Sequence, residues 1–214
     1  MIIKVCGMRE TENIRQVSQT GIHWIGFIFY DKSPRLFTTE EEGKEIPLTQ
    51  ASRVGVFVNA SLEQMIETAT KYQLHYLQLH GDETPEVCHQ LQKRGFSLIK
   101  AFAIATQQDL QKTGAYEGRV DYFLFDTACD NYGGSGKLFD WSVLENYKGN
   151  TPFILSGGIK PETAEAINRF THPQFAGIDL NSGFESAVGK KDIEKLQHFL
   201  SSLTCRTFSD DSNN

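Results

Sequence analysis

The chain has 214 residues, of which 39% are hydrophobic and 22% charged, and its formal net charge is −6. No apolar run approaches the ~20 residues that cross a bilayer, so the sequence excludes a membrane-spanning protein. The acidic balance argues against nucleic acid as the main partner, because phosphate backbones select a basic face. It leaves room for a small anionic substrate, since a few backbone N–H groups can bind a phosphate locally.

The start "MIIKVCGM" lacks the basic segment and long apolar stretch of a signal peptide. The four cysteines, Cys6, Cys88, Cys129 and Cys205, are scattered, without the close pairs of a zinc site or the density of a disulfide scaffold. We therefore expect a cytoplasmic protein with free thiols.

Short β-rich runs alternate with helical patterns along the chain. The expected strands are Ile2–Cys6, Trp24–Phe29, Arg53–Val58, Tyr76–Leu79, Leu98–Phe102, Tyr122–Asp126, Pro152–Ser156 and Ala176–Leu180. The expected helices are Thr11–Thr20, Thr39–Glu45, Leu62–Lys71, Pro85–Arg94, Gln107–Lys112, Trp141–Tyr147, Glu162–Arg169 and Asp192–Leu203. Eight such units predict a single-domain (β/α)₈ TIM barrel. An open, doubly wound parallel sheet remains the alternative.

No linker divides these units, so residues 1–203 are expected to form the barrel. The remaining residues, 204–214, end in the polar sequence "SDDSNN" and are expected to be a short disordered tail.

The chemistry of a barrel lies at the carboxyl ends of its strands, and unusual residues gather at these ends here. Cys6 ends the first strand and shares a face with Lys4, a cation that would favour the thiolate. Asp126 ends the sixth strand above apolar residues, where burial would favour a protonated carboxyl. Taken alone, Cys6 is more often a buried inert thiol and Asp126 equally often a loop cap. Together they supply a base and an acid for proton transfer at carbon.

Glycine-rich tripeptides follow the seventh and eighth strands. "SGG" contains Gly157 and Gly158, and "NSG" contains Ser182 and Gly183. Barrels commonly bind phosphate in these two loops with backbone N–H groups. One glycine-rich turn is a weak signal, but two in the expected loops predict a phosphate site.

His80 ends the fourth strand in "HGDE". No second histidine has metal-ligand spacing to it, so we expect a hydrogen-bonded loop residue and no metal site.

The chain resembles the phosphoribosylanthranilate isomerase family of tryptophan biosynthesis. The resemblance extends from Ile2 to about Leu200 and is carried by segments that occur in family order. These are "KVCGMR", "GFIFYDKSPR", "VGVFVN", "LQLHGDE", "DYFLFDT", "GGSGKLFDW", "LSGGIKPE" and "IDLNSGFES" followed by "GKKD". An ordered set of this length is very specific.

The resemblance implies a cofactor-free isomerase that performs an Amadori rearrangement of N-(5′-phosphoribosyl)anthranilate to 1-(2-carboxyphenylamino)-1-deoxyribulose 5-phosphate. Asp126 would be the general acid and Cys6 the general base. Arg35 would face the anthranilate carboxylate, and Asp179 would sit at the mouth beside the substrate. Gly157, Gly158, Ser182 and Gly183 would bind the phosphate, and the protein would be a monomer or homodimer.

Three alternatives stay open at this stage. Another phosphosugar barrel enzyme would need paired metal ligands or a lysine acid, and neither set is evident. A dual-substrate isomerase that also serves histidine synthesis resembles a barrel with aspartate, in place of Cys6, at the end of the first strand. A non-catalytic phosphometabolite-binding barrel would have no use for an intact acid and base.

Overall fold

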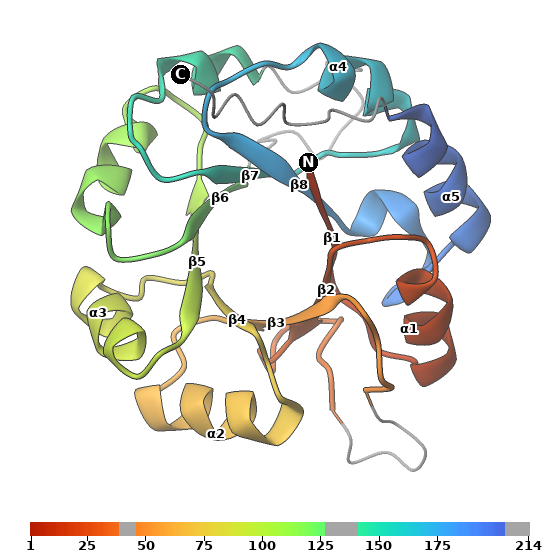
Figure 1. The fold of residues 1–214 in the computed structure, drawn as a ribbon, viewed down its shortest axis with the longest axis horizontal. Helices are drawn as coiled ribbons and strands as arrows, with labels where there is room; N and C mark the ends of the chain where they lie inside the picture. Colours follow the sequence, from red (N-terminus) through yellow and green to blue (C-terminus); the bar gives the residue numbers. More distant parts are fainter. Residues whose placement is uncertain (39–45, 127–140, 204–214) are drawn as a thin grey trace, which may run out of the picture.

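The computed structural model describes residues 1–38, 46–126 and 141–203. Eight parallel strands close into a barrel in sequence order, with β1 hydrogen-bonded to β8, so the expected (β/α)₈ fold is confirmed (Figure 1). The strands are β1 (Ile2–Val5), β2 (Trp24–Ile28), β3 (Ser52–Phe57), β4 (Tyr76–Leu79), β5 (Ser97–Ala103), β6 (Tyr122–Asp126), β7 (Phe153–Ser156) and β8 (Phe175–Leu180). The alternative of an open sheet is excluded.

Helices surround the barrel on the outside (Figure 1). The α-helices are α1 (Thr11–Ser18), α2 (Leu62–Tyr72), α3 (Pro85–Lys93), α4 (Ala164–Arg169) and α5 (Ile193–Ser202). The 3₁₀ segments are η1 (Asp109–Tyr116), η2 (Trp141–Asn146), η3 (Pro161–Thr163) and η4 (Ser182–Phe184). None of the described helices is both long and apolar enough to cross a membrane.

Local sequence explains where helices start. Ser61 caps α2 by accepting from the backbone of Gln64, whose side chain accepts from the Ser61 N–H in return. Thr84 caps α3 by accepting from the backbone N–H of Val87, with Pro85 in the first turn.

Two expected α-helices are 3₁₀ segments, and this is a correction. In η1 the backbone bonds run three residues back, as from Leu110 to Gln107, and the Thr113 hydroxyl donates to the Leu110 carbonyl. The side chain of Thr113 and the low helix propensity of Gly114 disfavour regular α geometry there. The expected helix Thr39–Glu45 lies outside the described residues, as does the tail 204–214.

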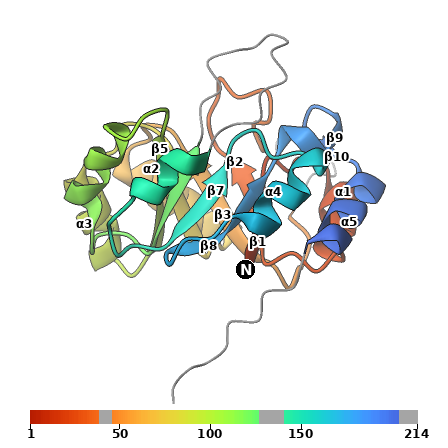
Figure 2. The same ribbon diagram turned by 90° about the horizontal axis from the view of Figure 1, so that it is seen from above.

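The sequence prediction missed a small hairpin after β8. Its strands β9 (Glu185–Ala187) and β10 (Lys190–Lys191) pair antiparallel. The hairpin lies beside α1 and α5 at the end of the barrel opposite the chain's N-terminus (Figure 2). This is the end to which the carboxyl ends of the parallel strands point, so the hairpin stands at the barrel mouth.

The barrel interior has an apolar lower part and a polar upper part. Trp24, Tyr76 and Tyr122 meet near its base, with ring centroids 4.5 and 5.1 Å from Trp24. Val54, Ile99, Ala101, Leu124 and Ile154 pack with Trp24 in the same cluster. Burial of this cluster fixes the strand faces, so the next inward residues toward the carboxyl ends form the candidate site.

Candidate active site

Cys6 directly follows β1 and points into the barrel. Its backbone N–H donates to the Leu180 carbonyl over 2.8 Å, and the residue is only 4% exposed. Gly26 of β2 leaves room for the thiol, since a Cβ at Gly26 would lie 2.8 Å from the Cys6 Sγ. Burial raises the pKa of the Cys6 thiol and outweighs the neighbouring Lys4 ammonium, which lowers it. The pKa is therefore raised, although the sequence led us to expect that Lys4 would favour the thiolate.

Lys4 and Asp179 form a buried ion pair on adjacent strands. The Lys4 Nζ lies 2.8 Å from the Asp179 Oδ2, and the two Cα atoms are register partners of β1 and β8. Burial would lower the pKa of Lys4, but Asp179 and Cys6 outweigh it and the pKa is raised. Burial also raises the pKa of Asp179. Asp179 is 6% exposed and lies on the level of Lys4, deeper than the mouth position expected for it.

The Asp179 Oδ1 has no hydrogen-bond partner in the described part of the chain. A buried carboxylate oxygen without a donor is costly, so this atom is a candidate acceptor for a ligand hydroxyl that reaches below the rim.

Asp126 ends β6 at the mouth, pairing in register with Ser156 of β7. Its carboxylate is 39% exposed, so the described residues bury it less than the sequence led us to expect. Its Oδ2 lies 3.7 Å from the Nε2 of His80, which directly follows β4. The other ring nitrogen of His80 is 2.9 Å from the Gln78 amide. His80 is therefore hydrogen-bonded, as expected, and it also faces the candidate acid.

The four predicted phosphate residues lie in two loops that touch. Gly157 and Gly158 follow β7 with φ of +81° and +63°, conformations that favour glycine. A Cβ at Gly183 would overlap the Ile159 carbonyl and lie 3.1 Å from the Cα of Lys160. The loops after β7 and β8 thus pack backbone against backbone, and Ser182 opens the 3₁₀ turn η4 there.

Arg35 lies beside the base rather than alone at the rim. A Cβ at Gly7, the residue after Cys6, would be 2.8 Å from the Arg35 Cδ. The Arg35 guanidinium binds Glu185 of β9 with two hydrogen bonds, of 2.8 Å from Nε and 2.6 Å from Nη2. Lys191 of β10 binds the same carboxylate over 2.7 Å.

Sequence reasoning gave Glu185 and Lys191 no role, although both stand in segments that carry the family resemblance. One signal was available in the sequence. Gly189 is typical of a hairpin turn, and Glu185 before it and Lys191 after it carry opposite charges.

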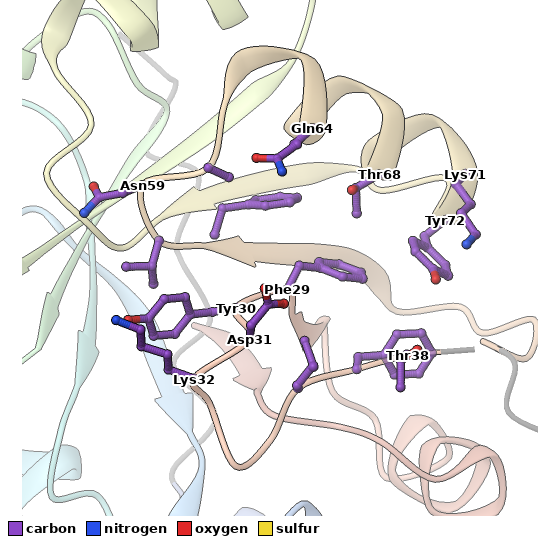
Figure 3. A pocket seen from close by; sticks show the side chains of 15 residues that line it. Phe29, Tyr30, Asp31, Lys32, Thr38, Asn59, Gln64, Thr68, Lys71 and Tyr72 are labelled. Carbon is purple, nitrogen blue, oxygen red and sulfur yellow. The ribbon is translucent and has the colours of Figure 1, made fainter. Parts of the chain in front are cut away.

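A cavity of about 610 Å³ lies away from these residues, between the segment after β2 and helix α2. In Figure 3, Tyr30, Asp31 and Lys32 lie on one side of it, and Gln64, Thr68 and Tyr72 lie on the other. None of the predicted site residues is among the residues that line it. We therefore place the chemistry at the barrel mouth and not in this cavity.

Within the described ranges, no three histidine, cysteine or acidic residues cluster so that they could hold a metal ion. The described part of the mouth contains a thiol directly after β1, a carboxyl at the end of β6 and glycine-rich backbone after β7 and β8. Such a set can transfer protons within a bound phosphate ester, with the acid and base reaching it from different strands.

Comparison with known proteins gives a consistent result. Residues 3–202 match the family model described as N-(5′phosphoribosyl)anthranilate (PRA) isomerase. The N-(5′-phosphoribosyl)anthranilate isomerase of Parabacteroides distasonis is 63% identical over 206 residues, 95% of this chain and 93% of the relative. The crystal structure of phosphoribosyl anthranilate isomerase from Thermotoga maritima superposes with a TM-score of 0.78 and 31% identity. It covers 94% of this chain and 98% of that one.

A further solved phosphoribosyl anthranilate isomerase is in complex with reduced 1-(o-carboxyphenylamino)-1-deoxyribulose 5-phosphate. It matches with a TM-score of 0.76 and 28% identity, covering 94% of this chain and 98% of that chain.

Proposed function

The chain belongs to the N-(5′-phosphoribosyl)anthranilate isomerase family, and from that premise we propose which of its residues carry the reaction. The protein is an isomerase of tryptophan biosynthesis. It converts N-(5′-phosphoribosyl)anthranilate to 1-(2-carboxyphenylamino)-1-deoxyribulose 5-phosphate by an Amadori rearrangement that uses general acid and base catalysis.

Asp126 is the general acid. It gives a proton to the furanose ring oxygen as the C1′–O bond breaks, and the nitrogen lone pair forms the C1′=N bond of a Schiff base. The position of its carboxylate at the end of β6, on the open side of the mouth, supports this role. His80 stands 3.7 Å away and helps to orient the carboxylate.

Cys6 is the general base. As thiolate it removes the proton from C2′, and the electron pair of that C–H bond forms the C1′=C2′ bond. The π pair of the C1′=N bond returns to nitrogen, which gives an enolamine that tautomerises to the ketone. Atoms balance, because the substrate and product are isomers and each proton taken by one group is returned by another. The buried Lys4 ammonium lowers the pKa of the thiol and so offsets part of the cost of burial, which raises it.

The binding groups follow the same division of the mouth. The backbone at Gly157, Gly158, Ser182 and Gly183 binds the phosphate. Arg35 binds the anthranilate carboxylate, for which a guanidinium fork is well suited. Asp179 accepts a hydrogen bond from the sugar through its unpartnered Oδ1.

One observation supports this assignment, namely that a thiol directly after β1 and a carboxyl at the end of β6 face one mouth beside two touching glycine-rich loops. The test is the loss of anthranilate-type fluorescence when the purified protein meets fresh substrate in the presence of a chelator. Cys6→Ala and Asp126→Asn should each slow turnover by about 10²–10⁴-fold while the protein stays folded.

Cys88→Ala is the matched control, because Cys88 is also a buried free cysteine but lies on α3, outside the mouth. It should leave turnover unchanged. Near-normal turnover in a folded Cys6→Ala or Asp126→Asn variant would remove that residue from the mechanism.

A further inference from the structure

A bridged group of charges stands at the mouth beside the candidate base. The Glu185 carboxylate accepts two hydrogen bonds from Arg35 and one of 2.7 Å from the Lys191 ammonium. The Lys191 Nζ also binds the Asn181 Oδ1 over 2.9 Å. Two cations share one anion, so the group keeps one net positive charge at a place where the substrate brings a carboxylate.

The hairpin fixes the Glu185 carboxylate independently of Arg35. The Gly189 N–H donates to its Oε1 over 3.1 Å from the turn between β9 and β10. The base of the hairpin is tied to α1, where the buried Asn13 side chain donates to the Lys191 carbonyl over 2.9 Å and accepts from its N–H over 2.7 Å. Glu185 is therefore held by the scaffold and not only by the arginine.

The carboxylate stays ionised under working conditions. Burial would raise the pKa of Glu185, but the hydrogen bonds from Arg35 and Lys191 outweigh burial and hold that pKa at about 2. A permanent anion at this position fixes the direction of the arginine fork at any neutral pH.

The contacts use one particular edge of the guanidinium. Glu185 takes the Nε and Nη2 edge of Arg35. A planar guanidinium has a second two-donor edge, formed by Nη1 and Nη2, and orienting one edge fixes the other. The side chain passes over Gly7, whose φ of +76° and lack of a Cβ permit this close approach next to Cys6.

We propose that Glu185 is a positioning residue that presents the second edge of Arg35 to the carboxylate on the substrate's aromatic ring, and so sets the preference for a carboxylated ring. This inference rests on the proposed role of Arg35. Glu185 does not touch substrate, and the substrate carboxylate does not displace it, because Lys191 and the Gly189 N–H hold it in place.

The test compares two ligands that differ only in the ring carboxyl. Reduced 1-(o-carboxyphenylamino)-1-deoxyribulose 5-phosphate and its counterpart without the carboxyl are titrated calorimetrically into wild type, Arg35→Ala and Glu185→Gln. Wild type should bind the carboxylated ligand more tightly. Arg35→Ala removes the charge-assisted contact to the ring carboxylate, and Glu185→Gln removes the anion that orients the Arg35 fork. Both variants should therefore reduce that preference by about tenfold or more and leave affinity for the other ligand nearly unchanged.

Glu117→Gln is the matched control. Glu117 is a partly buried carboxylate that accepts from Tyr147 and Thr151, remote from the mouth, so its loss perturbs stability without touching Arg35. This variant should keep the full preference. A merely structural role for Glu185 would weaken both ligands equally, and that result would overturn the proposal.

The outcomes separate this inference from the function on which it rests. Loss of preference in Arg35→Ala with full preference in Glu185→Gln rejects the positioning role and keeps the arginine role. Full preference in Arg35→Ala rejects both. If Glu185→Gln alone does not fold, the double variant Glu185→Gln/Lys191→Met removes one charge of each sign and gives the same two readings.

Discussion

At the scale of single residues, the state of Cys6 is decided by opposing effects. The thiol is buried, which raises its pKa, and it stands next to the Lys4 ammonium, which lowers it. Asp179 opposes Lys4, because its carboxylate raises the pKa of the thiol while binding that same ammonium. Lys4 and Asp179, which form one ion pair, therefore shift the pKa of the Cys6 thiol in opposite directions.

Replacing Lys4 by methionine should shift the pH dependence of Cys6 alkylation to higher pH. The substitution removes the cation that favours the thiolate and leaves the Asp179 carboxylate, which disfavours it. The rate of iodoacetamide reaction against pH measures the shift, with Cys6→Ala giving the background from other thiols. The pH profile of kcat/KM should move in the same direction.

The double variant Lys4→Met/Asp179→Asn is the control for this experiment. It removes both charges, and Lys4 acts on Cys6 more strongly than Asp179 does. Its profile should therefore lie between those of wild type and Lys4→Met. It also avoids an unpaired buried charge, which typically costs about 3–5 kcal/mol. An unshifted profile in both variants would contradict the tuning.

At the scale of strands and loops, much of the site could be predicted from the sequence. Alternation of apolar and polar residues fixes which side chains face inward, so Cys6 and Asp126 were identified from their strands alone, and β4 and β6 have the bounds expected for them. The hairpin escaped prediction because its strands are only three and two residues long. The salt bridge between Arg35 and Glu185 joins residues 150 apart, and no local pattern signals such a contact.

The strand β2 makes room for the base, so Gly26→Ala should slow turnover. The new methyl group would lie 2.8 Å from the Cys6 Sγ and 3.2 Å from the Cys6 Cα, and the thiol must move to accept it. Displacing a reacting group by about 1 Å can cost about a hundredfold in rate, so kcat should fall by between about tenfold and about a hundredfold.

Gly114→Ala provides the comparison for Gly26→Ala, because a Cβ at Gly114 meets nothing within 4 Å. It should leave kcat unchanged. A folded Gly26→Ala protein with wild-type kcat would mean that the position of the thiol tolerates this displacement.

At the scale of the whole molecule, the repeat of strand and helix predicts the barrel, because eight such units pair in sequence order. Closure itself is not a local property. It depends on β1 meeting β8, residues more than 170 positions apart, through partners such as Ile2 with Gly177 and Lys4 with Asp179. The same pairing brings Cys6, directly after β1, beside the glycine-rich loop after β8. Barrel closure and the site therefore both depend on this seam between β1 and β8.

Gly177→Ala should weaken this seam and destabilise the entire barrel. An added Cβ at Gly177 would overlap the Ile2 carbonyl oxygen and lie 2.7 Å from the Ile2 Cβ, and the backbone atoms there can yield only if the strands separate. Forcing extra volume into a packed site typically costs about 1–3 kcal/mol, and for a chain of this length each kcal/mol lowers Tm by about 2–4 °C.

Far-UV circular dichroism and the fluorescence of tryptophan, including Trp24 at the barrel base, should report one coincident and lowered transition, because a closed barrel unfolds as a unit. Gly114→Ala should leave Tm almost unchanged, while a Gly177→Ala protein with wild-type Tm would show that the seam has more slack than the close approach of β1 and β8 indicates.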